Sequence, residues 1–430
     1  MRSRKLLTRV FLRRFIENDL ISPDTDHMQV VSTAAGGLFA AAMFVTVFMG
    51  IKYVMAPFPS PGSTAVIELD DQFLFCAWPM LVMSIVALVE WDVLGFDSRD
   101  SAILGPLPIP RAAIVLAKLT AIVLFAAVFL AALTVAPAVL HPVLVISRLR
   151  ASVGTAVVLM AAQLAASVAA GLFGFSATLA VREVVHALLG ASLFRRVSRG
   201  LQVALLTSCA TMLLLMPLAS SRVALRIMQQ QADRSELPPD WFVAVHETIG
   251  GHLIDALPRP ELPPRVAQHE RLATSEYRAA KPRFVVLSWR AAAALLISVA
   301  LAVSGFAWNA RRLAPPPFDR TRRRRSRWVD YVGAVFVPRD PTARAGFHFA
   351  ARTLGRSVVH RMAVVAAVAA ALAASLVVVH ASIAGGGGAS PSVFAMQPFA
   401  LAVLLAAFRH AVRLPAELRA GWCVSMAWRA

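Results

Sequence analysis

The stretch LTAIVLFAAVFLAALTVA, residues 119–136, is eighteen residues long and contains no charged side chain. An apolar run of about 18 residues or more is typical of a helix that crosses a lipid bilayer. Its residues would be apolar on every face of a helix, unlike those of a helix at the surface of a soluble domain. We therefore predict a membrane span that extends from near residue 112 towards residue 145, with Pro137 and Pro142 bending or ending it.

The composition of the whole chain supports a membrane protein. Of its 430 residues, 58% are hydrophobic and 16% are charged, and the mean hydropathy is +0.66. The charged residues are clustered, so other long apolar runs remain between the clusters. We predict an all-α fold, a polytopic helical membrane protein with about eight transmembrane helices and both termini in the cytoplasm.

The predicted spans divide the chain into segments. Besides the span quoted above, we expect spans near residues 31–54, 73–94, 153–181, 201–219, 284–308, 362–383 and 393–408. The segments are a cytoplasmic amphipathic N-terminal helix (1–30), a five-span region (31–219), an extracytoplasmic segment (220–283), the sixth span (284–308), a basic cytoplasmic segment (309–361), the last two spans (362–412) and a cytoplasmic C-terminal segment (413–430). The segment between the first two spans carries Glu68, Asp70 and Asp71 but no Lys or Arg, and is expected outside.

The net charge of +19 lies largely in predicted loops. The most basic stretch is residues 311–327, which includes Arg322–Arg325. Positively charged loops stay on the cytoplasmic side, so this charge orients the spans and does not predict a nucleic-acid partner. The expected surroundings are the lipid bilayer of a bacterial cytoplasmic (inner) membrane. An alternative function is a non-transporting scaffold whose basic stretch binds anionic lipid.

The N-terminal stretch, residues 3–20, alternates apolar and basic residues at helical spacing. The apolar residues are Leu6, Leu7, Val10, Phe11 and Phe15, and the basic ones on the other face are Arg9, Arg13 and Arg14. This pattern predicts an amphipathic helix on the inner leaflet, with an ordinary soluble helical tail as the alternative. No small-residue cleavage site follows a short apolar core, so a signal peptide is not predicted.

Residues 90–119, EWDVLGFDSRDSAILGPLPIPRAAIVLAKL, contain the pattern that best indicates a function. A short amphipathic segment from Asp97 to Leu104 carries the charged residues Asp97, Arg99 and Asp100 and the apolar residues Ile103 and Leu104. A segment this short is not a stable helix by itself, so we expect it to dock on another surface. A turn containing Pro108 follows, and Arg111 begins the next span.

This stretch resembles the cytoplasmic loop between the second and third spans of ABC-2 type permeases, the membrane subunits of one class of ABC exporter. The shared pattern is a charged pair, a small residue, two apolar residues, a proline-centred turn, a basic residue and a lysine in the next helix. The matching residues are Arg99, Asp100, Ser101, Ile103, Leu104, Leu107–Arg111 and Ala117–Leu119. The resemblance implies that residues 91–111 form a coupling loop that docks on a separate ATPase subunit, and that the permease is a homodimer or heterodimer.

The resemblance covers roughly residues 1–308, and the loop is its most specific part. The amphipathic N-terminal helix is similar to the connector helix of that family, and the segment 220–283 corresponds to its extracellular helices. The family has a core of six spans, fewer than we predict here. The basic insert 311–361 is also absent from the family's simple pattern. The substrate therefore does not follow from the resemblance.

Three charged residues, Glu90, Lys118 and Arg290, fall inside predicted spans. Charges within a membrane are functional candidates by default, although each of these lies near a span end and its charged head could reach the lipid headgroups. Glu90 and Lys118 are expected near the same membrane face. We hypothesise that they form an ion pair that holds the base of the loop.

No G-x-x-x-x-G-K-[ST] motif occurs in the chain, so ATP hydrolysis is expected only in a partner subunit. We predict no catalytic residue, no cofactor and no metal site. His246 and Glu247 begin a stretch similar to H-E-x-x-H, but Gly250 occupies the place of the second histidine, and His252 would lie on another helix face. A membrane-embedded, metallopeptidase-like enzyme using these residues is kept as an alternative. The preceding residues 238–242, PPDWF, are expected to anchor at the outer membrane surface.

A stripe of small residues, Ala162, Ala166, Ala170 and Gly174, recurs at four-residue spacing in the predicted fourth span. Such a stripe allows two helices to approach closely in lipid. We expect a static packing contact here, with a moving interface as the alternative.

Overall fold

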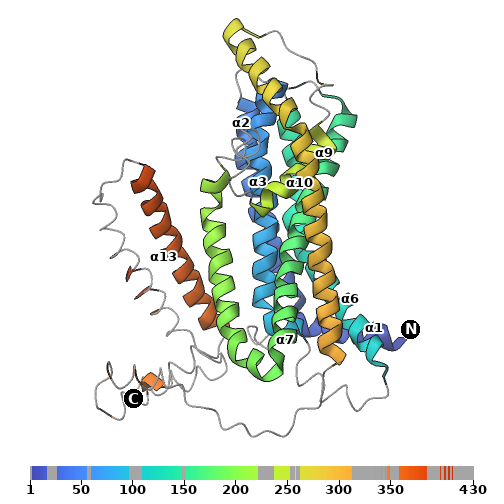
Figure 1. Cartoon of the computed structure of the whole chain (residues 1–430), viewed down its shortest axis with the longest axis vertical. Helices are drawn as coiled ribbons and strands as arrows, with labels where there is room; N and C mark the ends of the chain where they lie inside the picture. Colours follow the sequence, from blue (N-terminus) through green and yellow to red (C-terminus); the bar gives the residue numbers. More distant parts are fainter. Residues whose placement is uncertain are drawn as a thin grey trace. The chain divides into compact units, whose positions relative to one another are not determined.

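The computed structural model describes most of the first 311 residues and one further helix. The described residues are 2–16, 27–55, 60–95, 109–147, 149, 151–220, 237–251, 257, 262–311 and 358–384, with scattered positions at 331–348 and 398–409. Regular structure in these ranges is α-helical, without strands (Figure 1). The predicted all-α fold is confirmed. The helices are α1 (Arg2–Ile16), α2 (His27–Met55), α3 (Pro61–Val89), α4 (Trp91–Leu94), α6 (Arg111–Ile146), α7 (Val153–Ser220), α9 (Pro238–Gly250), α10 (Pro264–Arg311) and α13 (Val358–Ala384).

Six segments of the described chain are long and apolar enough to cross a membrane. They are Ser32–Met55 in α2, Pro61–Val89 in α3, Arg111–Ile146 in α6, Val153–Phe194 and Arg196–Met216 in α7, and Pro264–Arg311 in α10. The chain is therefore a multi-pass helical membrane protein by the length and composition of its helices. α13 contains a shorter apolar stretch, Val364–Val379, where the seventh span is predicted. The predicted span 393–408 lies outside the described residues, apart from a few positions.

The long helices α6 and α7 show how proline and glycine act in this chain. α6 continues through Pro137 and Pro142 and ends at Ile146, so neither proline terminates it. α7 contains a break at Gly190, where φ is 69° and ψ is 165°. This left-handed backbone is readily accessible only to a glycine. The break falls near the end of the first candidate span of α7, Val153–Phe194, and between the spans predicted at 153–181 and 201–219.

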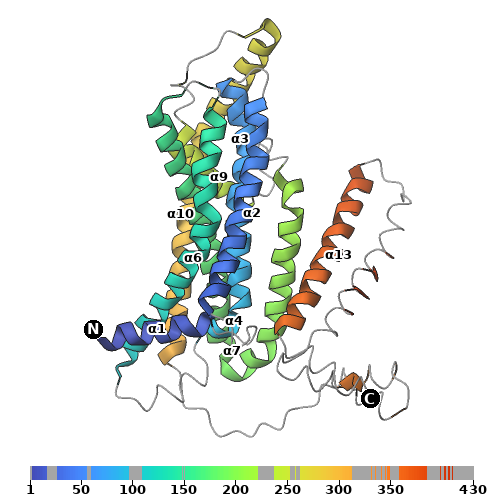
Figure 2. The same cartoon turned by 180° about the vertical axis from the view of Figure 1, so that it is seen from behind.

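The chain divides into two compact units. The first contains residues 1–16, 26–202 and 215–313, and the second contains residues 17–25, 203–214 and 314–430. In the first unit, α2 and α1 both pack against α6, and α9 packs between α3 and α10. Figure 2 shows α1 crossing the ends of α2 and α6. One apolar face of α1 makes this contact. Leu7, Phe11 and Phe15 are buried on this face, whereas Leu6 and Val10 are exposed.

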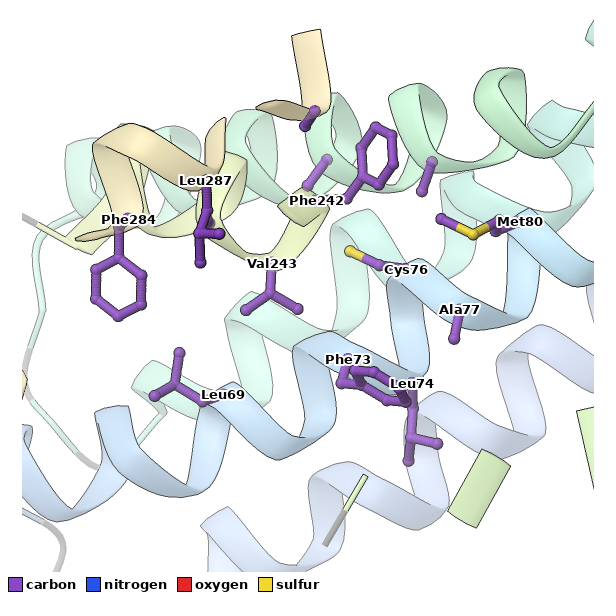
Figure 3. Packing of buried hydrophobic residues seen from close by; sticks show 14 of the residues in the cluster. Leu69, Phe73, Leu74, Cys76, Ala77, Met80, Phe242, Val243, Phe284 and Leu287 are labelled. Atoms are coloured by element: carbon purple, nitrogen blue, oxygen red, sulfur yellow. The ribbon is translucent and has the colours of Figure 1, made fainter. Parts of the chain in front are cut away.

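The core of the first unit is formed by α3, α7, α9 and α10. Figure 3 shows Phe73 of α3, Phe242 and Val243 of α9, and Phe284 and Leu287 of α10 around this core. Phe242 and Val243 have no exposed surface, and Phe242 lies 5.5 Å from the ring of Phe173. The expectation that Phe242 rests at the membrane surface is therefore wrong. Truncating a phenylalanine in such a core costs about 3–5 kcal/mol.

The acidic residues expected in an outer loop instead belong to α3. Glu68 and Asp71 lie within this helix and are 8% and 2% exposed. The helix begins earlier than the apolar run because tertiary partners compensate these charges. The prediction of a loop here is wrong for this reason.

The first turn of α3 is capped by a distant side chain. Pro61 occupies the first turn, and Ser60 makes no side-chain cap of its own. Instead, the Glu270 carboxylate of α10 accepts the backbone N–H groups of Gly62 and Ser63 at 2.6 and 3.0 Å. A carboxylate at a helix N-terminus satisfies free N–H groups and favours the helix dipole. This cap fixes α10 to the start of α3.

The small-residue stripe forms a close contact between α7 and α3. Ala162, Ala166 and Ala170 have no exposed surface. At Gly174, an added Cβ would collide with the backbone carbonyl of Met80. The predicted close helix approach is confirmed, since only a glycine fits against this carbonyl.

Candidate functional site

The described residues before the predicted coupling loop end at Gly95, and those after it begin at residue 109, just before α6. Its candidate residues Asp97, Arg99, Asp100, Ile103, Leu104 and Pro108 lie outside the described residues. Arg111 is the first residue of α6 and is exposed. The flanks of the loop are described, and they show how its base is held.

A buried lysine contacts the base of the loop. The Lys118 side chain is 2% exposed, and its Nζ donates a hydrogen bond to the carbonyl oxygen of Gly95. The same Nζ lies 5.5 Å from the ring centroid of Phe11 in α1. A buried ammonium needs such partners because desolvation of the charge is costly. Lys118 therefore links α6 and α1 to the point where the loop begins.

Glu90 lies next to this contact in the sequence, at the junction of α3 and α4, and is 7% exposed. Glu90 and Lys118 are thus both buried in the protein. A direct ion pair between them stays a prediction. Arg290 is exposed on α10 and lies apart from these two in the sequence.

An arginine completes the support of α4. Arg182 donates from Nε to the carbonyl oxygen of Trp91 at 2.7 Å and pairs with the adjacent Glu183. The Trp91 indole donates to Ser198 at 2.8 Å. Asn309 of α10 donates to the Glu183 carboxylate at 2.6 Å. Together these bonds join α4, α7 and α10.

Gly95 is required by the same packing. A Cβ at Gly95 would collide with the guanidinium of Arg182. In addition, Gln202 donates to the Leu88 carbonyl at 2.6 Å, which ties the second part of α7 to the end of α3. We call this buried polar set the α4 anchor; its members are Trp91, Gly95, Lys118, Arg182, Glu183, Ser198, Gln202 and Asn309.

A second buried polar group surrounds Asp71 of α3. Its carboxylate contacts Lys52 Nζ at 2.6 Å and accepts a hydrogen bond from the Tyr53 hydroxyl at 2.6 Å. His141 Nε2 lies 3.6 Å from the same carboxylate, and the His141 ring packs 4.6 Å from the ring of Phe75. The charge of Asp71 is therefore paired, which explains how it is accommodated within a membrane-spanning helix.

A third group, which we call the α9 cluster, consists of Glu68, Gln72, His246, Glu247 and Tyr277. His246 lies between two carboxylates: its Nδ1 is 3.0 Å from Glu247 Oε1, and its Nε2 is 3.8 Å from Glu68 Oε1. Gln72 Nε2 donates to Glu68 at 3.3 Å and lies 3.3 Å from His246 Nε2. The Tyr277 hydroxyl of α10 donates to Glu247. The cluster thus connects α3, α9 and α10.

Electrostatics in the α9 cluster favour a protonated imidazole. Burial opposes the charge on His246, but the hydrogen bond with Glu247 and the negative charges of Glu247 and Glu68 outweigh it. The pKa of His246 is consequently raised above its ordinary value. Nδ1 can donate to Glu247 at hydrogen-bond distance, whereas Nε2 lies at ion-pair distance from Glu68.

The α9 cluster borders a small cavity of about 30 Å3. Glu68, His246 and Glu247 form its polar wall, while Val145 and Leu159 belong to its apolar wall. The cavity therefore combines buried polar groups with apolar surface and has the size of about one or two water molecules.

The sequence pointed to the loop but missed these clusters. Glu68, Asp71 and Gln72 are spaced three and four residues apart, a signal for one helix face. These residues precede the apolar run of their helix, so the span predicted at 73–94 excludes them. His246 and Glu247 were considered only as an incomplete zinc motif.

The metallopeptidase alternative gains no support. His252 lies outside the described residues. Among the residues that the structure describes, no group of three His, Cys, Asp or Glu side chains has a geometry suited to a metal ion. The residues 312–327 of the lipid-binding alternative also lie outside the described part of the chain.

In comparisons with known proteins, no family model, curated protein or solved structure matches this chain.

Proposed function

We propose that the chain is the membrane subunit of an ABC-2-like exporter, driven by a separate cytoplasmic ATPase that docks on residues 97–104. In this proposal the subunit has eight spans with both termini inside. It resides in the cytoplasmic membrane of a bacterium, and it functions as a homodimer or heterodimer. The observation that carries the proposal is the α4 anchor, which ties the base of the candidate coupling loop to the membrane helices.

The anchor gives the loop a mechanical connection. Lys118 and Arg182 bind the backbone carbonyls of Gly95 and Trp91, so the main chain itself is held at the start of the loop. A force on the loop would be passed to α6 through Lys118 and to α7 through Arg182. A loop that served only as a turn between two spans would not need two buried cations at its base, since burying a cation is costly.

A movement of the loop can be passed along α6, because α6 follows the loop directly in the chain. α6 runs from Arg111 beside the loop to Ile146, so a movement at the loop can reach the other end of the same rigid helix. The chain itself lacks a phosphate-binding motif for ATP, so the energy must come from a partner. Alternating access would then consist of helix movements driven from the loop.

The test uses a photo-crosslinking amino acid at Asp100 of the full-length protein in native membranes. We expect an adduct with a protein that carries a G-x-x-x-x-G-K-[ST] motif and hydrolyses ATP. The matched control carries the same amino acid at Val153, which is 81% exposed and follows the far end of α6. The control should give no such adduct.

A second variant replaces residues 97–104 with Gly and Ser. We expect it to lose the ATPase activity that co-purifies with the wild-type chain in mild detergent. Co-purification of equal ATPase activity with this variant would show that the loop is not the docking site.

A further inference from the structure

We infer that α1 docks on the headgroups of anionic phospholipids through a face of the helix that the protein leaves uncovered. We call this surface the outer face of α1; its described members are Lys5, Leu6, Arg9 and Val10, and all four are exposed. The occupant is the surface of the bilayer, and neither an ATPase nor a second copy of the chain is required. Lipid docking by α1 is therefore independent of the proposed exporter.

An inner row of side chains attaches α1 to the protein. Leu7, Phe11 and Phe15 form this row and are 8%, 4% and 3% exposed. The Phe15 ring stacks on Phe125 of α6 with the two centroids 5.3 Å apart, and the Phe11 ring centroid lies 5.5 Å from Lys118 Nζ. These contacts fix which side of α1 faces α6, so the other sides of the helix face away from it.

Two further rows run beside the inner row at the same four-residue spacing. Leu6 and Val10 form an apolar row and are 63% and 56% exposed. Lys5 and Arg9 form a basic row and are exposed as well. Successive residues of an α-helix are turned by about 100°, so the apolar row lies between the inner row and the basic row. The protein thus uses one of the two apolar rows, and the other joins a charged strip, as in helices that lie in a membrane interface.

α1 meets α6 at the level where α6 enters its charge-free run, residues 119–136. Lys118 is the last charged residue before this run, and Phe125 lies inside it. Leu116 and Val123 of α6 remain 46% and 64% exposed at the same level, as expected of residues that contact hydrocarbon. α1 crosses the end of α6 here (Figure 2). It therefore lies at the boundary between headgroups and hydrocarbon, where amphipathic helices insert their apolar side by about 5–10 Å.

The charge of α1 selects the class of lipid. Its residues 2–16 include no Asp or Glu and six basic residues, which are Arg2, Arg4, Lys5, Arg9, Arg13 and Arg14. A basic residue near an anionic surface strengthens the attraction about fivefold. A zwitterionic headgroup has no net charge and provides no comparable gain. The exposed cations Lys5 and Arg9, next to an apolar row, therefore fit an anionic headgroup above its acyl chain.

The experiment replaces Val10 with an environment-sensitive fluorescent amino acid in the full-length protein. The protein is placed in phosphatidylcholine nanodiscs that contain a small fraction of nitroxide-labelled phosphatidylglycerol, or the same fraction of nitroxide-labelled phosphatidylcholine. We expect the phosphatidylglycerol to quench the probe with a binding constant about fivefold higher or more, as one or two basic residues at the surface provide. High salt should lower this preference because it screens the charges.

Two matched controls separate specific docking from general contact with lipid. Lys5→Gln with Arg9→Gln should reduce the preference to about one, because the basic row is removed. Arg265→Gln with Arg271→Gln removes the same charge from exposed positions of α10 and should leave the preference unchanged.

A probe at Leu296, which is 70% exposed within a candidate span of α10, should be quenched equally by the two lipids. Every variant is first checked for the unfolding temperature of the wild type, and Leu6 replaces Val10 as the probe position if the Val10 variant is unstable.

Each result supports or overturns lipid docking by α1. A preference for phosphatidylglycerol that depends on Lys5 and Arg9 supports it. Equal quenching by the two lipids, or a preference that survives removal of the basic row, would overturn the assignment to anionic lipid. A probe that neither lipid quenches would show that water or a protein covers the outer face. None of these results depends on whether an ATPase crosslinks to the loop, so failure of the exporter and failure of lipid docking are distinguishable.

Discussion

The α4 anchor and the α9 cluster are both buried and polar, but their hydrogen bonds reach different targets. In the anchor, Lys118 and Arg182 donate to backbone carbonyls. In the cluster, the contacts of His246 are with the side chains of Glu68 and Glu247. Bonds to the backbone fix the course of the chain. Contacts among titratable side chains depend on protonation.

The two groups also lie far apart along the same helix. Glu68 and Glu90 mark the two regions of α3, and at 1.5 Å per residue they are separated by about 33 Å. One end of the bundle is thus built to hold a loop, and the other is built around a cavity. Four variant sets test this contrast.

The largest effect is expected from Arg182→Leu in the anchor. Removing the guanidinium leaves Glu183 without its cation and the Trp91 carbonyl without its donor, which costs about 3–5 kcal/mol. Thermal unfolding in detergent measures this loss. Arg199→Leu is the matched control, because Arg199 is an exposed arginine of the same helix and should change stability little. Equal stability of the two variants would show that the contacts of Arg182 in the α4 anchor do not stabilise the fold.

A double-mutant cycle tests whether Glu90 and Lys118 form an ion pair at the base of the loop. If Glu90 and Lys118 interact, the free-energy losses of Glu90→Gln and Lys118→Met should differ from additivity by about 0.5–3 kcal/mol. Chemical unfolding of the single and double variants provides the four values. Losses that simply add would show that no ion pair between Glu90 and Lys118 supports the loop.

The α9 cluster should make stability depend on pH. Because the pKa of His246 is raised in the folded state, its contribution is fully present below about pH 6.5 and is lost as pH rises through the folded pKa. Each unit by which the pKa is raised corresponds to about 1.4 kcal/mol. Unfolding temperatures of the wild type should fall over this interval, whereas those of His246→Gln should change less. Parallel pH profiles for the two proteins would contradict the prediction.

The smallest effect is expected from Glu270→Ala, which removes the carboxylate that caps α3. Loss of a helix N-terminal cap costs about 1 kcal/mol. Glu276→Ala, an exposed residue of the same helix, should be nearly neutral. Differential scanning fluorimetry compares the two variants. A Glu270 variant as stable as the control would mean that the bonds to Gly62 and Ser63 add nothing.

Much of the membrane fold was predictable because each span is a continuous run of apolar residues in the sequence. The span at 119–136 corresponds to α6, and the one predicted at 31–54 corresponds to α2. The stripe that ends at Gly174 was also predictable, because small residues at helical spacing commonly mark a close contact between two helices in lipid. These features depend on neighbours along the chain.

The candidate site was only partly predictable. Lys118 was identified as a charge inside a span, but its acceptor, the Gly95 carbonyl, could not be read from composition. Arg182 falls between the spans predicted at 153–181 and 201–219, but its side chain is buried and contacts Trp91. A charged residue is assigned to solvent by default, and only packing reveals a partner that compensates its burial.

The sequence by itself determined that this protein is helical and crosses a membrane several times, because hydrocarbon solvent demands long apolar segments with internal backbone hydrogen bonds. Tertiary structure decided where charge could be buried. It placed Glu68 of α3 beside His246 of α9, and Arg182 of α7 beneath α4. Contacts between residues so distant in the chain leave no periodic signal, since they depend on the way the helices pack.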